Sequence, residues 1–121
     1  MQLDWNAVRE RYEGGRSVRP LVGGSTLRVC PGADDSIRVA QRLWQADVTR
    51  AELEVALDLL GARPPSTPAV AFSEELRRYY SGGPQVQPTC SRTPNLCAVV
   101  LKDLGYLDGD PGSGSTAAQT P

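Results

Sequence analysis

Histidine is absent from this chain of 121 residues. The imidazole ring is the commonest general base near neutral pH and a frequent metal ligand in its neutral form. A serine or cysteine nucleophile paired with histidine is therefore excluded within this sequence. A catalytic group would have to be a carboxylate, a tyrosine, Lys102 or an unassisted thiolate, and the chain carries no recognisable catalytic motif. The sequence accordingly favours a non-enzymatic protein.

Motifs that hold phosphate cofactors or metals are also missing. The three glycine pairs lack the GxGxxG and GxxxxGKS/T spacings of nucleotide-binding loops, and they are typical of turns. The cysteines, Cys30, Cys90 and Cys97, include no closely spaced pair of the kind that structural zinc sites use. We therefore expect no cofactor and no metal.

Targeting signals and long apolar runs are likewise lacking. No segment has the length of a signal peptide or a membrane span, and charged residues occur from the start of the chain. Three cysteines do not form a disulfide framework and are typical of a reducing compartment. The net charge of −1 gives no strong attraction of the whole molecule to anionic surfaces. We expect a cytoplasmic protein with no membrane partner.

Helical spacing and helix-terminating residues predict most of the fold. Residues 3–13, 34–46, 49–60, 73–80 and 93–104 carry these signals. The clearest is 49–60, which opens with the capping-box spacing of Thr49 and Glu52 and ends before Gly61. Residues 17–22 and 25–30 flank Gly23-Gly24 and predict a tight β-hairpin. The predicted fold is α+β and helix-dominated, with four to five helices and one small β-hairpin in a single compact domain.

The domain is predicted to cover residues 1–107. Residues 108–121, rich in Gly, Ser, Thr and Pro, contain nothing that can build a core, and they predict a disordered tail. The side chains expected to be largely buried are Trp5, Trp44, Leu53, Leu57, Leu60, Val100, Leu101 and Leu104.

Arginines on the predicted hairpin are its most unusual feature. A two-residue Gly-Gly turn would place Arg19 directly opposite Arg28, and like charges in such a pair destabilise strands. A carboxylate such as Glu13 or Asp34, or an external anion, would have to offset them. With Arg16 nearby, the hairpin forms a candidate surface for nucleic-acid phosphates or another anion. The alternative is that these arginines cover apolar surface and pair with helix carboxylates.

Cys90 is the candidate reactive thiol. It lies in a predicted loop near Arg92 and the start of the last helix, and both neighbours favour a thiolate. An inert cysteine is nevertheless the favoured interpretation of this residue. Cys97 falls on the apolar stripe of the last helix and is expected to be a core thiol.

The preferred hypothesis is a non-enzymatic small binding or regulatory domain that contacts nucleic-acid phosphates through Arg16, Arg19 and Arg28. The alternative is a protein–protein adaptor or accessory subunit that uses an exposed apolar face of the last helix. The partner is accordingly a nucleic acid or a protein, and the sequence does not predict an oligomeric state.

Overall fold

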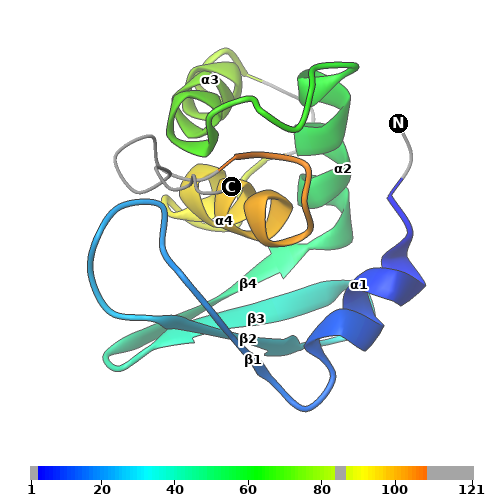
Figure 1. Ribbon diagram of the computed structural model, residues 1–121, viewed down its shortest axis with the longest axis vertical. Coiled ribbons are helices and arrows are strands. Elements are labelled where there is room, and N and C mark those ends of the chain that lie inside the picture. Colours follow the sequence, from blue (N-terminus) through cyan, green and yellow to red (C-terminus); the bar gives the residue numbers. More distant parts are fainter. Residues whose placement is uncertain (1–2, 84–86, 109–121) are drawn as a thin grey trace.

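The computed structural model describes residues 3–83 and 87–108, and within them four helices and four strands follow one another along the chain (Figure 1). The elements in order are α1 (Trp5–Tyr12), β1 (Arg16–Val18), β2 (Leu27–Pro31), β3 (Ser36–Gln41), β4 (Trp44–Thr49), α2 (Arg50–Leu60), α3 (Ala69–Ser81) and α4 (Thr93–Asp103). Among the described residues, no helix combines the length and apolar content needed to cross a bilayer.

The strands form one antiparallel sheet in the order β1-β2-β3-β4. Side chains alternate between its two faces. On β3, Ile37 and Val39 are completely buried, whereas Arg38 between them is exposed. Arg38 lies opposite Asp47 on β4, and their side chains form an ion pair of 3.1 Å on the exposed face.

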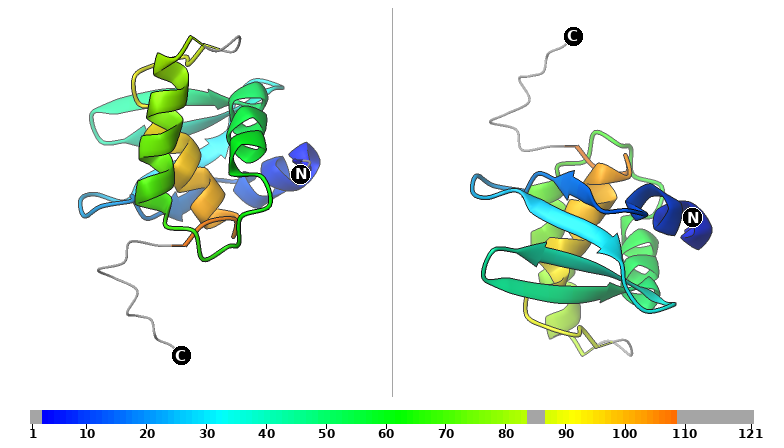
Figure 2. Two further views of the ribbon diagram at one scale, coloured as in Figure 1. Left: turned by 90° about the horizontal axis from the view of Figure 1, so that it is seen from above. Right: turned by 90° about the horizontal axis from the view of Figure 1, so that it is seen from below.

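Three helices cover the apolar face of the sheet. Figure 1 shows the sheet at one side and α2, α3 and α4 in layers above it, with α1 beside one end of the sheet. Helix α4 is the central element, because it contacts α2, α3 and β4. Every residue from Leu96 to Leu101 is buried. Seen from below, the opposite face of the sheet carries no helix of the described part of the chain (Figure 2).

The prediction of a helix-dominated fold with one small hairpin is wrong. The described residues form four helices, within the four to five expected, but a four-stranded antiparallel sheet stands in place of the single hairpin. The largest difference lies at 34–46, where the predicted helix is the β3–β4 hairpin. Its apolar residues fit a helical stripe, but the alternation of Ile37, Arg38 and Val39 also fits a strand, and pairing with β2 decides between the two. Asp34 and Asp35 lie in a tight turn, closed by the Ser36 amide donating to the Ala33 carbonyl.

The predicted pairing of Arg19 with Arg28 is also wrong. Arg28 lies opposite Ser17, and β1 ends at Val18, so that residues 19–26 form an open loop instead of a two-residue turn. Pro20 explains the early end of β1, because it has no N–H to donate to the ladder. The shift is two residues, so Val18, Leu27 and Val29 still share the buried face.

The predicted helix 49–60 is confirmed as α2. Thr49 and Glu52 make both hydrogen bonds of the capping box, and Gly61 follows the last turn with a positive φ of 59°. Most of the predicted core is also confirmed as buried, but Trp44 and Leu104 are only partly buried. Asp108 is fastened by backbone hydrogen bonds to Thr67 and Ala69, and the rest of the predicted tail lies outside the described residues.

Candidate anion-binding site

Charge is divided unevenly along the chain and across the fold. No carboxylate side chain occurs in three segments, residues 14–33, 36–46 and 87–102. These segments nevertheless hold most of the basic side chains that lie outside α1, α2 and α3. The loop 19–26 and the β3–β4 hairpin project from the same end of the sheet, as the views in Figures 1 and 2 agree. The carboxylates of Asp34 and Asp35 lie in the turn at the opposite end.

Contacts join the loop 19–26, the hairpin and α4 into one surface. The Gln41 side-chain amide donates to the Ser25 carbonyl at 2.7 Å, which holds the hairpin against the loop. The guanidinium of Arg92 lies over the Trp44 ring, 4.3 Å from its centroid. We call this surface the basic loop end and define it by the side chains of Arg19, Arg42, Arg92 and Lys102.

A cavity of about 340 Å³ opens at the basic loop end. Its lining comprises Arg19, Pro20, Leu21, Gly23, Gly24, Thr26 and Lys102, and no carboxylate is among these residues. The Lys102 ammonium donates to the Pro20 carbonyl at 3.5 Å, which fixes α4 beside the loop. A Cβ at Gly23 or Gly24 would meet no atom within 4 Å, so the loop backbone is open to an approaching ligand. Two cations at a cavity that no carboxylate lines suit an anion.

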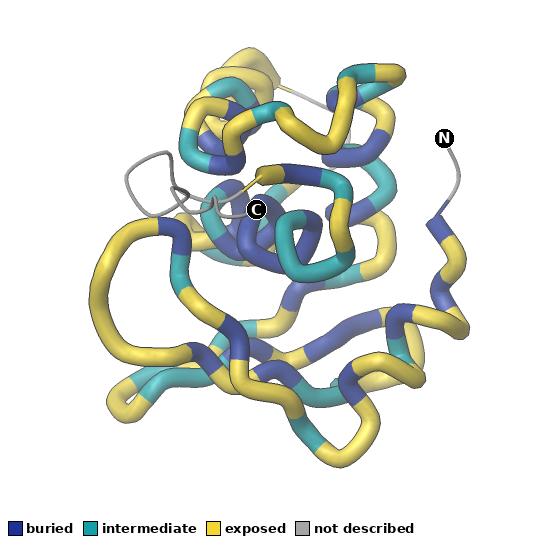
Figure 3. The backbone as a smooth tube through the Cα atoms, viewed as in Figure 1, coloured by how far each residue is buried: buried dark blue, intermediate teal, exposed yellow. Residues whose placement is uncertain are grey.

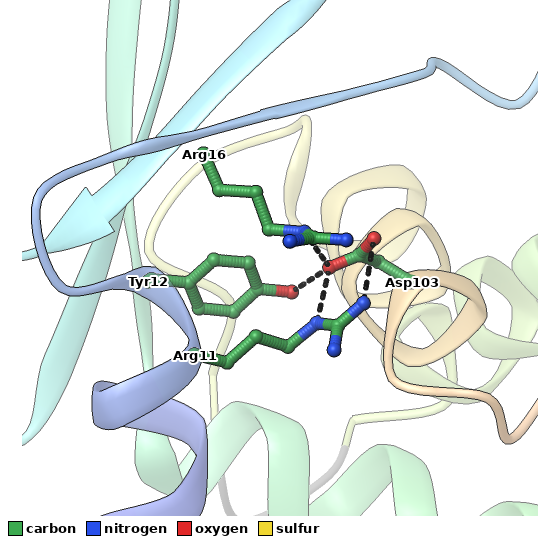
Figure 4. Close-up of polar contacts among 4 residues, drawn as sticks. All are labelled: Arg11, Tyr12, Arg16 and Asp103. Atoms are coloured by element: carbon green, nitrogen blue, oxygen red, sulfur yellow. Dashed lines mark hydrogen bonds and ion pairs between the residues drawn. The ribbon is translucent and has the colours of Figure 1, made fainter.

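The three arginines predicted as one site are separated. Arg16 lies on the helix side of the sheet, with Nε 3.6 Å from Asp103 Oδ2 (Figure 4). Arg28 is on the other face, where its Nη2 donates to the Gly14 carbonyl at 3.2 Å. Arg19 is exposed, and the described residues give it no hydrogen bond or ion pair. Of the predicted set, only Arg19 therefore lines the cavity.

The Asp103 carboxylate binds polar side chains from α1 and β1, as Figure 4 shows. Its Oδ2 accepts from Arg11 Nε at 2.8 Å and from the Tyr12 hydroxyl at 2.7 Å. Burial disfavours the carboxylate, but the hydrogen bonds from Arg11 and Tyr12 outweigh it and leave the pKa of Asp103 below its usual value. Burial and the bond to Asp103 raise the pKa of Tyr12. The cluster fastens the first helix to α4 and leaves Arg16 engaged within the protein.

The cysteines give little support to covalent chemistry. Cys90 is half-buried just before α4, and its sulfur lies 3.7 Å from the Thr93 hydroxyl. It borders a cavity of about 560 Å³ beside β4, which also exposes Asp35 and Asp47. Cys97 is buried as predicted, and burial raises the pKa of its thiol. Within residues 3–83 and 87–108, no group of His, Cys, Asp or Glu side chains could hold a metal ion.

Sequence reasoning missed three members of the basic loop end. Arg42 was assigned to a helix, although it occupies the turn between Gln41 and Trp44. Lys102 reaches Pro20 across 82 positions of sequence, and only the packing of α4 reveals that contact. The absence of carboxylates from three separate segments was the one sequence signal that could have found the surface.

Comparison of the chain with protein-family models, with curated proteins and with solved structures gave no match.

Proposed function

We propose that this protein is a non-catalytic binding domain that contacts the phosphodiester groups of its partner through the basic loop end. The observation that carries the proposal is the cavity shared by Arg19 and Lys102, because no carboxylate lines it and the glycine backbone beside it is open. A nucleic-acid backbone, the partner expected from the sequence, supplies such groups in a regular array. Arg16 and Arg28 are not part of the proposed surface, because neither lines the cavity. Arg16 lies 3.6 Å from Asp103, and Arg28 donates to the Gly14 carbonyl.

The adaptor alternative gains no surface from α4. The apolar residues on which that hypothesis depended, from Leu96 to Leu101, are buried beneath the other elements.

The test is the anisotropy of a labelled mixed-sequence DNA duplex titrated with the protein at several salt concentrations. The variant Arg19→Gln/Lys102→Gln removes both cavity cations. The control Arg50→Gln/Arg77→Gln makes the same change of charge at exposed arginines of α2 and α3, which pair there with Glu54 and Glu74.

Wild type and control should bind the duplex with an affinity that falls as salt rises. The cavity variant should bind more weakly, with a slope of log affinity against log salt that is shallower by about two, because two phosphate contacts are lost. Equal binding by both variants would show that the cavity is not the contact surface. Thermal unfolding of each variant checks that the fold is intact.

A further inference from the structure

The basic loop end also exposes apolar side chains. Leu43, in the turn of the β3–β4 hairpin, is 89% exposed, and Val22, in the loop 19–26, is 62% exposed. Figure 3 shows both segments as exposed stretches of the backbone. Among the described residues, the third exposed large apolar side chain is Tyr79 on α3, which is 42% exposed. Two of these three exposed apolar side chains thus lie on the basic loop end.

The fold gives Leu43 no structural role. Two-residue hairpin turns favour Asn, Asp and Gly, because these residues adopt the turn conformation at least cost. Arg42 and Leu43 occupy this turn instead. A leucine at the tip contributes almost nothing to the core, since its side chain remains in water. Its position is explained more simply by a partner that buries it.

Cations flank the exposed apolar tips. Arg42 is the sequence neighbour of Leu43, and Arg19 and Lys102 line the cavity that Gly23 and Gly24, next to Val22, also line. Aliphatic tips surrounded by basic side chains match a surface that is anionic outside and apolar beneath. An anionic phospholipid bilayer has this layered chemistry.

A nucleic acid would contact the cations of this surface but not its apolar side chains. Its phosphates would pair with the cations, but the aliphatic tips would remain against water or polar backbone. Base stacking requires planar side chains, and Trp44, the aromatic residue of the hairpin, is partly buried beneath Arg92. The exposed Leu43 and Val22 therefore favour the phospholipid over the nucleic acid.

The charge at the other end of the sheet supports one orientation on such a surface. Asp34 and Asp35 occupy the β2–β3 turn, and Glu10 of α1 and Glu13 just after α1 lie beside Pro31 at the end of β2. Arg9 also lies there and donates to the Asp34 carbonyl, so these four carboxylates outnumber the cation beside them. Because charge is screened over about 8 Å at physiological salt, the nearby cations govern docking despite the net charge of −1. The acidic end would face away from the lipid.

The geometry points to docking of this protein on anionic phospholipid bilayers, with Leu43 and Val22 entering the headgroup region and the cations of the basic loop end pairing with lipid phosphates. This inference rests on the proposed function, since it uses the same cations and names the phosphodiester that they contact. The expectation of no membrane partner was based on the lack of membrane-spanning and targeting segments and on the net charge of the whole molecule. The present inference replaces it, because it concerns one surface of the folded protein.

The test is co-sedimentation with vesicles of phosphatidylcholine, with and without phosphatidylserine, beside the DNA titration described above. The variant Val22→Ser/Leu43→Ser removes both apolar tips and keeps every charge. Since both side chains are exposed, its thermal unfolding should match that of the wild type. The Arg19→Gln/Lys102→Gln variant and its Arg50→Gln/Arg77→Gln control complete the set.

Wild type should bind the vesicles that contain phosphatidylserine and not the neutral ones. The apolar variant should bind at least tenfold more weakly, and the cavity variant about thirtyfold more weakly. Vesicle binding that depends on the cations but not on Val22 and Leu43 would overturn the bilayer inference and leave the proposed function intact. DNA binding without vesicle binding would do the same. Failure to bind either probe would overturn both.

Discussion

Replacing Asp103 with alanine should lower the free energy of unfolding by about 3 kcal/mol at pH 7. The largest part comes from Tyr12, which is completely buried and donates its hydroxyl to Asp103 at 2.7 Å. A buried donor left without its acceptor costs about 1–3 kcal/mol. The ion pair with Arg11 adds at most about 1 kcal/mol, because the arginine side chain is 35% exposed and solvent screens the pair.

The assay is urea unfolding of four proteins: wild type, Asp103→Ala, Tyr12→Phe and the double variant. The double-mutant cycle isolates the Tyr12–Asp103 term, which should be about 1–3 kcal/mol. Asp47→Ala is the matched control, because its ion pair with Arg38 has both side chains nearly half exposed and should contribute under about 1 kcal/mol. Additive single effects in the cycle would refute the reasoning.

The same bond predicts a pH dependence. The folded-state pKa of Asp103 lies below its usual value, so its contribution is fully present above the unfolded pKa of about 3.9. That contribution is lost as the pH falls through the folded pKa. The stability difference between wild type and Asp103→Ala should therefore stay constant from pH 7 to about 5 and shrink below about 4. A difference that grew on acidification would contradict the sign of the shift.

Three further substitutions or reactions test separate features. Gly15→Ala should destabilise the protein by at least about 1 kcal/mol in urea unfolding, because Gly15 has a φ of 87° and a Cβ there would collide with the Arg28 guanidinium. Its control, Gly23→Ala, should be nearly neutral, because a Cβ at Gly23 would meet no atom within 4 Å. Glu52→Gln should cost about 1–3 kcal/mol in the same assay, because the buried carboxylate accepts two backbone N–H groups and the amide can accept only one without turning its own donors toward the other. Iodoacetamide should modify Cys97 more slowly than Cys90 in the folded protein, as peptide mass spectrometry would show, because burial both shields the thiol and raises its pKa.

Elements whose signals are local were predicted well. Helix α2 begins at a capping box and ends at Gly61, and both features depend on residues within a few positions. The same holds for α4, whose predicted start at Thr93 is observed. Only its first residue and its apolar spacing were needed.

Elements whose signals depend on residues far away in the sequence were not predicted correctly. Residues 34–46 satisfy helical and strand periodicity alike, and β3 forms because Val39 can pair with Val29 on β2 and with Ala46 on β4. The candidate site shows the same limit. Arg19 was recognised from its loop, but Lys102 joins it only after α4 has packed against that loop.

The order of the chain has a consequence for folding during synthesis. The sheet is complete at Thr49, yet the helix that covers the centre of its apolar face begins at Thr93. Arg11 likewise cannot form its ion pair until Asp103, 92 positions later in the chain, has been synthesised. A nascent chain that has not yet released α4 would expose a finished but uncovered sheet, the kind of surface that aggregates or recruits chaperones. The last helix therefore acts as the step that commits the whole chain to its folded state.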